Sequence, residues 1–271
     1  MTKNNKVVLI TGASSGMGKY TAIYLAENGY TVYAAARRPM EDLKLKGIHT
    51  LSMDVTDQDS VKAGVKQLID EQGRVDVLVN NAGFGSYGAI EDMSIADARY
   101  QMEVNVFGVA AVTQAVLPHM RSQKSGTIIN ISSIGGKVAM PFGGWYHASK
   151  FALEALSDSL RGEVKPFGIK VVVIEPGGVK SEWGSIAVSN LKKVSGNSVY
   201  RDTALKVAST FEKLEPRNAE PEVIAKMILR AIEQKNPKIR YSGGMMAKPL
   251  LFMRKILSDK MMDSLIGSQM K

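Results

Sequence analysis

Short apolar runs alternate with amphipathic segments along the chain, and this alternation constrains the fold more than any other feature of the sequence. The apolar runs are flanked by Gly, Asn, Asp or Pro, as buried strands are, and they occupy residues 7–10, 31–35, 49–53, 75–79, 127–131 and 171–174. Amphipathic segments with helical spacing lie between them, at residues 18–28, 60–72, 95–116 and 149–165. Parallel strands need such crossovers, so we predict an α/β fold with a doubly wound, mainly parallel sheet and helices on both faces.

The length and composition are those of one soluble domain. A chain of 271 residues fits a single large α/β unit, and we assign residues 1–271 to it. There is no cysteine, and His49, His119 and His147 lack ligand-like spacing, so we expect no metal site. Residues 1–6 are polar and lead directly into the first apolar run, without the apolar stretch of a signal peptide, and no segment has transmembrane length. We therefore expect a cytoplasmic protein.

The first apolar run ends in a glycine-rich turn that passes at once into a helical segment. Its residues are Thr11, Gly12, Ala13, Ser14, Ser15, Gly16, Met17 and Gly18. Glycines at a strand-to-helix turn let backbone N–H groups approach a pyrophosphate, and the positive end of the helix dipole favours that anion. The spacing is one residue longer than the usual Rossmann fingerprint, and a glycine-rich turn alone could be only a tight turn. Its position after the first strand favours a Rossmann-type dinucleotide site.

Two arginines at the end of the second apolar run indicate which dinucleotide is bound. A carboxylate at this position would hold the ribose hydroxyls of NAD, whereas Arg37 and Arg38 stand here and match the 2′-phosphate of NADP. Either arginine alone could be an ordinary surface residue. Asp54 and Val55 follow the third run and are expected to meet the adenine, although an Asp there could also be a helix cap. We therefore predict NADP(H) in preference to NAD(H).

Tyr146 and Lys150 are candidates for acid/base chemistry. They are four residues apart at the start of a helical segment, so both side chains leave one face of the helix. A nearby ammonium lowers the pKa of a phenol, by about 1–3 units, toward the range useful at neutral pH. A Tyr and a Lys one turn apart also occur by chance in many helices. The pair therefore indicates a catalytic site only in combination with the glycine turn.

Polar residues near two other elements complete the candidate site. Ser132 and Ser133 follow the fifth apolar run, at the sheet edge where a substrate would lie, and a serine hydroxyl there could bind a carbonyl oxygen or merely cap a helix. Asn105 interrupts an otherwise apolar helical segment, so its side chain needs a partner, such as a water or a backbone group.

Together these motifs resemble those of the short-chain dehydrogenase/reductase family, over roughly the first 185 residues. The motifs are the glycine turn from Thr11 to Gly18, Asn80-Asn81-Ala82-Gly83, Asn105, Ser133, Tyr146-x-x-x-Lys150 and Pro176-Gly177. By this resemblance Tyr146 transfers the proton, Lys150 lowers the Tyr146 pKa and holds the nicotinamide ribose, Ser133 positions the substrate oxygen, and Asn105 anchors a relay water. The thirteen-residue spacing to Tyr146 selects Ser133 rather than Ser132.

The resemblance also extends the expected cofactor site beyond the glycine turn. The additional residues that it implies are Asn81, Ala82 and Gly83 beside the cofactor, and Pro176, Gly177, Val179 and Ser181 near the carboxamide. Family members often carry Thr where this chain has Ser181, so the hydroxyl is kept.

The last third of the chain carries most of the basic excess. Residues 190–271 hold 16 Lys and Arg against 8 Asp and Glu. We expect a substrate loop at about residues 181–215, which resembles that of the hydroxysteroid and retinol dehydrogenase branch, and a basic amphipathic helix at about residues 249–266. This helix could contact a membrane surface, but packing against the core or a second subunit is the preferred interpretation.

The preferred function is an NADP(H)-dependent oxidoreductase that moves a hydride between nicotinamide and a carbonyl or secondary alcohol of a lipophilic small molecule. The alternative is a non-catalytic NADP-binding sensor or scaffold. A nucleic-acid binder ranks last, because no binding module accompanies the basic charge. The expected assembly is a homodimer or homotetramer.

Overall fold

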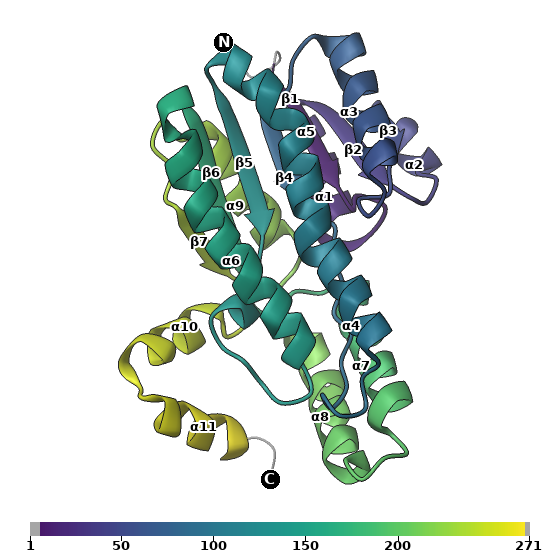
Figure 1. Cartoon of the computed structure of the whole chain (residues 1–271), viewed down its shortest axis with the longest axis vertical. Helices are drawn as coiled ribbons and strands as arrows, with labels where there is room; N and C mark the ends of the chain where they lie inside the picture. The colour runs from purple at the N-terminus through teal and green to yellow at the C-terminus, as the bar shows by residue number, and fades with distance from the viewer. Residues whose placement is uncertain (1–5, 269–271) are drawn as a thin grey trace.

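A seven-stranded parallel sheet forms the centre of the molecule, with the strand order β3-β2-β1-β4-β5-β6-β7 (Figure 1). The computed structural model describes residues 6–268. The strands are β1 (Val7–Thr11), β2 (Thr31–Ala36), β3 (His49–Ser52), β4 (Val77–Asn80), β5 (Gly126–Ile131), β6 (Ile169–Pro176) and β7 (Arg240–Gly243).

Helices connect successive strands and cover both faces of the sheet (Figure 1). The α-helices are α1 (Gly16–Glu27), α2 (Glu41–Lys44), α3 (Gln58–Gln72), α4 (Ile95–Met102), α5 (Gly108–Gln123), α6 (Gly144–Val164), α7 (Glu182–Ser195), α8 (Arg201–Leu214), α9 (Glu222–Glu233), α10 (Ala247–Ile256) and α11 (Asp259–Ser268). The shorter turns are the π-helix η2 (Glu103–Phe107) and the 3-10 helices η3 (Ile134–Gly136), η4 (Lys165–Phe167) and η5 (Glu215–Arg217).

The alternation of side chains along β1 accounts for the two-faced core. Val8 and Ile10 pack with the apolar residues of α1 and α9, whereas Val7 and Leu9 pack with those of α3 and α5. Successive strand residues point to opposite faces, so a strand that is apolar throughout is stable only when helices cover both sides. The predicted single Rossmann-type domain with a doubly wound parallel sheet is therefore confirmed.

Three predicted elements differ from the structure. The predicted helix at residues 95–116 is divided by η2, whose wider turn places Asn105 toward the backbone of Phe84. The predicted substrate loop at residues 181–215 is largely helical, because α7 and α8 bury Ala187, Leu191, Ala204 and Ala208 in one cluster.

The predicted helix at residues 249–266 is also two helices, α10 and α11. Leu257 is extended, and the Ser258-Asp259 pair that follows is a typical helix start. In Figure 1 the two helices form an arm below the β7 edge, apart from α7 and α8.

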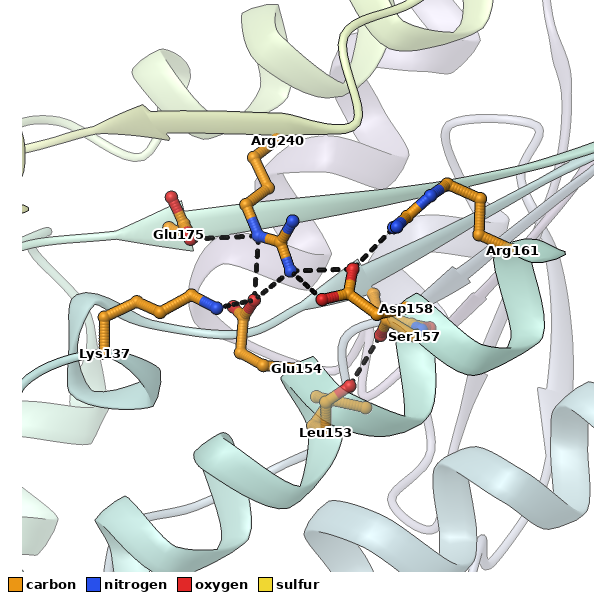
Figure 2. A network of polar contacts seen from close by, with 9 residues as sticks. Lys137, Leu153, Glu154, Ser157, Asp158, Arg161, Glu175 and Arg240 are labelled. Atoms are coloured by element: carbon orange, nitrogen blue, oxygen red, sulfur yellow. Dashed lines mark hydrogen bonds and ion pairs between the residues drawn. The ribbon is translucent and has the colours of Figure 1, made fainter.

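Strand β7 was not predicted, and a cluster of charged residues attaches it to α6 (Figure 2). Arg240, at the start of β7, donates to Glu154 Oε2 from Nε at 3.0 Å and binds Asp158 Oδ2 at 2.7 Å. The Arg240 Nε also lies 3.5 Å from Glu175 Oε1 on β6. Lys137 reaches Glu154 Oε2 at 3.0 Å from the loop after β5. The contacts of Arg240 thus join the end of β6 and the start of β7 to the middle of α6.

Glu175 makes this cluster sensitive to pH. Burial, followed by the nearby Glu154 carboxylate, raises the pKa of Glu175 from 4.5 to about 7. The folded protein therefore retains a proton between about pH 4.5 and 7 that the unfolded chain has released. Stability contributed by this group is present below that interval and is lost as the pH rises through it.

We predict that Glu175→Gln raises the free energy of unfolding by about 2 kcal/mol at pH 8 and changes it little at pH 4, because glutamine carries no charge to bury. Urea unfolding at both pH values measures the effect. Glu163→Gln, which removes an exposed charge from α6, is the matched control. Equal effects of Glu175→Gln at the two pH values would contradict the prediction.

Candidate active site

The glycine turn lies at the carboxyl end of β1, where the strand order changes direction between β1 and β4. This is the point at which open α/β sheets bind their ligands. Gly12 and Gly16 have φ values of +65° and +53°, which glycine adopts without strain. A Cβ on Gly12 would lie 2.7 Å from Ala82 Cα, and one on Gly18 would collide with the Asn81 side chain. The turn therefore has the tight backbone that a pyrophosphate site requires.

Asn81 connects the glycine turn to β4. Its Nδ2 donates to the carbonyls of Thr11 and Gly12 at 3.1 and 3.0 Å. The Thr11 hydroxyl in turn accepts from the backbone N–H groups of Asn81 and Ala82, each at 3.1 Å. These bonds satisfy the backbone at the ends of both strands and fix the distance between them. Thr11 was expected only as part of the turn, and its bracing role is visible only in the structure.

The two arginines after β2 take different positions. Arg38 donates to the hydroxyls of Ser14 and Ser15 at 3.3 and 3.1 Å, so it lies directly beside the glycine turn. Arg37 instead donates to the Tyr100 hydroxyl of α4 at 2.8 Å. Both guanidinium groups are largely exposed and could accept a phosphate ligand.

The remaining cofactor candidates on this side line the same sheet edge. Arg37 Nη1 is 4.0 Å from Asp54 Oδ2, and the Asp54 carboxylate accepts from both the backbone and the hydroxyl of Thr56. Val55 packs against Gly108 at the start of α5. Met17 packs against the apolar cluster beneath α1. Asp54 thus closes a local turn with Thr56, whereas the helix cap that the sequence allowed at Asp54 is supplied by Asp57, the N-cap of α3.

Ser133, Tyr146 and Lys150 come together at the carboxyl end of β5, and all three are buried. The Lys150 Nζ donates to the carbonyl of Ile131, the last residue of β5, at 2.8 Å. The Ser133 hydroxyl accepts from Gly135 N at 2.9 Å and lies 3.5 Å from the Pro176 carbonyl. These contacts attach the start of α6 to the ends of β5 and β6.

Burial controls the protonation of Tyr146 and Lys150. Desolvation raises the pKa of Tyr146 to about 12, and a hydrogen bond with Ser133 acts in the opposite direction. Desolvation also lowers the pKa of Lys150 to about 8, against the attraction of Glu154. The expected lowering of the Tyr146 pKa is thus not found, because desolvation outweighs the hydrogen bond with Ser133; the Lys150 ammonium donates to the Ile131 carbonyl. Tyr146 is protonated at neutral pH.

Asn105 is fully buried in the π-helix η2 and has the backbone partner that the sequence required. Its Nδ2 donates to the Phe84 carbonyl at 2.9 Å and to Ser149 Oγ at 3.0 Å, while its Oδ1 accepts from Phe84 N at 3.1 Å. A Cβ on Gly83 would lie 3.1 Å from Asn105 Oδ1 and 3.6 Å from Lys150 Nζ. Asn105 therefore holds the segment after β4 against α6, beside Lys150.

The segment after β6 bends back over the glycine turn. Gly177 N donates to the Gly243 carbonyl at 2.8 Å, and Val179 forms a bridge with Ala219. Ser181 is the N-cap of α7, and a Cβ on Gly16 would lie 3.3 Å from its side chain. Of the expected carboxamide residues, Ser181 thus lies beside the glycine turn, whereas Gly177 and Val179 contact the segments at Gly243 and Ala219.

The beginning of α7 also makes an ion pair with the side chain that lies on that turn. Glu182 Oε2 is 3.7 Å from the guanidinium of Arg38. Since Ser181 and Glu182 are consecutive, α7 begins beside the glycine turn.

Aromatic residues pack around the Tyr146 ring. The Tyr146 ring centroid is 5.1 Å from that of Trp183 and 5.8 Å from that of Tyr87. Tyr87 also contacts Phe211 of α8, at 5.6 Å between centroids. Trp183 and Phe211 lie within the segment predicted as the substrate loop, residues 181–215. Tyr87 and Phe142 were not predicted, because they lie far from that segment in the chain and share no periodicity with it.

The described residues include neither a metal-binding cluster nor a membrane-spanning helix. No group of three or more His, Asp and Glu residues in the range 6–268 is arranged to hold a metal ion. None of the helices in that range combines the length and the apolar character needed to cross a bilayer.

Proteins of similar sequence and fold identify the family of this chain. The profile of the family described as short chain dehydrogenase matches residues 6–190. A 3-ketodihydrosphingosine reductase of Bacteroides thetaiotaomicron is 42% identical over 259 residues, which cover 95% of each chain. An NADPH-dependent 3-dehydrocapnine reductase of Ornithobacterium rhinotracheale is 33% identical, with 98% of each chain covered. The crystal structure of a short-chain dehydrogenase from Streptomyces avermitilis superposes with a TM-score of 0.81 at 33% identity, covering 99% of this chain and 96% of the other.

The fold and the site define an oxidoreductase that binds a nicotinamide dinucleotide at the carboxyl edge of a parallel sheet. The chain belongs to the short-chain dehydrogenase/reductase family, whose members act on alcohol and carbonyl groups. The residues fit that cofactor, because the glycines of the turn leave the backbone accessible and an added Cβ on Gly12 or Gly18 would fill the cradle.

We predict that Gly12→Ala weakens NADPH binding by about tenfold or more, because a methyl group there collides with the Ala82 backbone and strains a left-handed residue. Titration of NADPH fluorescence measures the affinity. Gly47→Ala is the matched control: its φ is +74°, but an added Cβ would meet no atom within 4 Å. An unchanged NADPH affinity in Gly12→Ala would contradict the assignment of the cradle.

Proposed function

We propose that the protein is an NADPH-dependent reductase that converts the 3-keto group of a long-chain lipid base to a secondary alcohol. The observation that carries this proposal is the position of Tyr146. It is a buried proton donor with Ser133 beside it and Trp183 and Tyr87 around its ring. A proton donor in an apolar enclosure suits a ketone that is joined to a hydrocarbon chain.

The side chains divide the work of carbonyl reduction. When bound, NADPH supplies the hydride that reduces the carbonyl carbon. Tyr146 donates its phenolic proton to the carbonyl oxygen, and its raised pKa keeps that proton available at neutral pH. Ser133 donates a hydrogen bond to the same oxygen as negative charge develops on it. Lys150 in its ammonium form supports the phenolate that remains.

The substrate class follows from the aromatic residues around Tyr146 and from two relatives. Apolar and aromatic residues of α7 and α8 pack in one cluster with Tyr146. The similar proteins from Bacteroides and Ornithobacterium are named as reductases of 3-ketodihydrosphingosine and 3-dehydrocapnine. The non-catalytic sensor is not favoured, because every candidate catalytic side chain is present and gathered at one sheet edge.

The choice of NADPH over NADH rests on the arginines after β2. Arg38 lies on the hydroxyls of Ser14 and Ser15, and Arg37 lies beside Asp54. A 2′-phosphate would gain charge-assisted hydrogen bonds from these guanidinium groups, whereas a 2′-hydroxyl would not.

The direct test is NADPH consumption with 3-ketodihydrosphingosine in detergent micelles, compared with a short aliphatic ketone. We expect turnover of the long-chain ketone and a lower kcat/KM for the short one. Tyr146→Phe should lower kcat by about 10²–10⁴-fold, because the general acid is lost, while NADPH affinity stays within about twofold. Tyr20→Phe, which removes the hydroxyl of an exposed tyrosine on α1, is the control. Full turnover by Tyr146→Phe would remove this residue from its role.

Cofactor preference has its own test. We predict that Arg38→Ala weakens NADPH by about 10- to 100-fold and NADH by much less, because the lost contacts are made to the phosphate. Dissociation constants for both dinucleotides measure the difference, with Arg230→Ala on the exposed face of α9 as the control. An equal loss for the two dinucleotides would refute the phosphate assignment.

A further inference from the structure

Glu154 occupies an unusual place for a carboxylate, in the middle of α6 and almost completely buried (Figure 2). Its Oε2 accepts from Arg240 Nε and lies at the same distance, 3.0 Å, from Lys137 Nζ. Its Oε1 is also buried and has no hydrogen-bond partner among the described residues. Burying an ionised carboxylate is expensive unless it is paired, so such a residue calls for a reason.

The position of Glu154 relative to Lys150 supplies that reason. The two residues are four apart on α6, so their side chains leave the same face of the helix one turn from each other. Lys150 is itself buried, and its Nζ donates to a neutral acceptor, the Ile131 carbonyl. Glu154 is the negative charge that acts on Lys150 and favours its ammonium form.

The surrounding elements are built to admit the Glu154 side chain. Gly136 of η3 packs against it, and a Cβ at that position would lie 3.0 Å from Glu154 Cγ and 3.1 Å from the Lys150 carbonyl. Arg240 of β7 approaches from the other side and also binds Asp158, one turn further along α6. The same turn of α6 is thus fixed against both η3 and β7.

We propose that Glu154 is a positioning residue for catalysis: it holds Lys150 in the ammonium form and, through Arg240, fixes the turn of α6 that carries Lys150. This inference rests on the role of Lys150 in the proposed function. The positive charges of Arg240 and Lys137 offset the free-energy cost of burying the Glu154 carboxylate. The same carboxylate stabilises the Lys150 ammonium one helical turn away by electrostatic attraction.

The charged and titratable groups around this pair come from five elements. On α6 they are Tyr146 and Asp158, and the other elements contribute Lys137 after η3, Glu175 on β6, Arg240 on β7 and Lys255 on α10. Burial raises the pKa of Glu175 to about 7, so near neutral pH its carboxyl group is partly protonated and carries only part of a negative charge.

A direct measurement of the Lys150 pKa tests the proposal without any substrate. Heteronuclear NMR of the lysine Cε and Nζ groups in the full chain gives this value. We expect Glu154→Gln to lower the pKa of Lys150 by about one unit, because an opposite charge one helical turn away is lost. Glu154→Asp keeps the charge on a shorter side chain, so its Lys150 pKa should lie between those of Glu154→Gln and the unaltered protein.

Glu163→Gln is the control, because it removes a charge of the same sign from an exposed position on α6. Wild-type Lys150 pKa values in both Glu154 variants would overturn the proposal. Glu154→Asp alone decides the question if Glu154→Gln does not fold, since a wild-type Lys150 pKa in that variant is then the overturning result.

The kinetic consequence has a definite sign. A lower Lys150 pKa means that the ammonium is lost at a lower pH, so the alkaline fall of kcat in Glu154→Gln should begin about one pH unit earlier. A purely structural role would lower kcat equally at all pH values. If no long-chain ketone is reduced, the proposed function fails while the NMR result for Lys150 still stands or falls by itself.

Discussion

The parallel pairing of β1 with β4 is the interaction on which the rest of the molecule depends. The strand order reverses between these two strands. The segments that follow β1 and β4 therefore lead to helices on opposite faces of the sheet. Asn81 and Thr11 close this point with reciprocal bonds between side chain and backbone. Every candidate site residue is reached by a chain segment that leaves the sheet along this carboxyl edge, so the site requires the correct register of the central strands.

A second constraint is the burial of charge behind the site. Arg240, Glu154 and Glu175 lie between α6 and the last two strands, where a simple apolar contact would have been less costly. Ionic contacts in such a place specify one orientation, whereas apolar contacts tolerate sliding. These contacts fix the orientation of α6, the helix that carries Tyr146 and Lys150. The free-energy cost of burying the charges is therefore associated with the placement of these two side chains.

Much of the fold and of the glycine turn could be predicted because their signals are local. An apolar run followed by glycines encodes a buried strand and its turn within a dozen residues, and β1 lies within one residue of its prediction. Strand β7 has the sequence Arg-Tyr-Ser-Gly, which contains no apolar run, so it could not be predicted from local pattern. Its Arg240 is stabilised by carboxylates from distant segments of the chain. Gly184 and Gly196 obscure the helical pattern of α7 and its end. The Tyr146 pKa could not be read from its spacing to Lys150, since burial is a property of the assembled fold.

Helix α7 gives the molecule a mechanical link between its two halves. Its first residues lie on the glycine turn, through Ser181 beside Gly16 and Glu182 beside Arg38, while Trp183 one residue later covers the Tyr146 ring. One short segment therefore contacts both the glycine turn and the ring of Tyr146. Because Ser181 and Trp183 are only two residues apart, any shift of the start of α7 would change its contacts with the glycine turn and with the Tyr146 ring together.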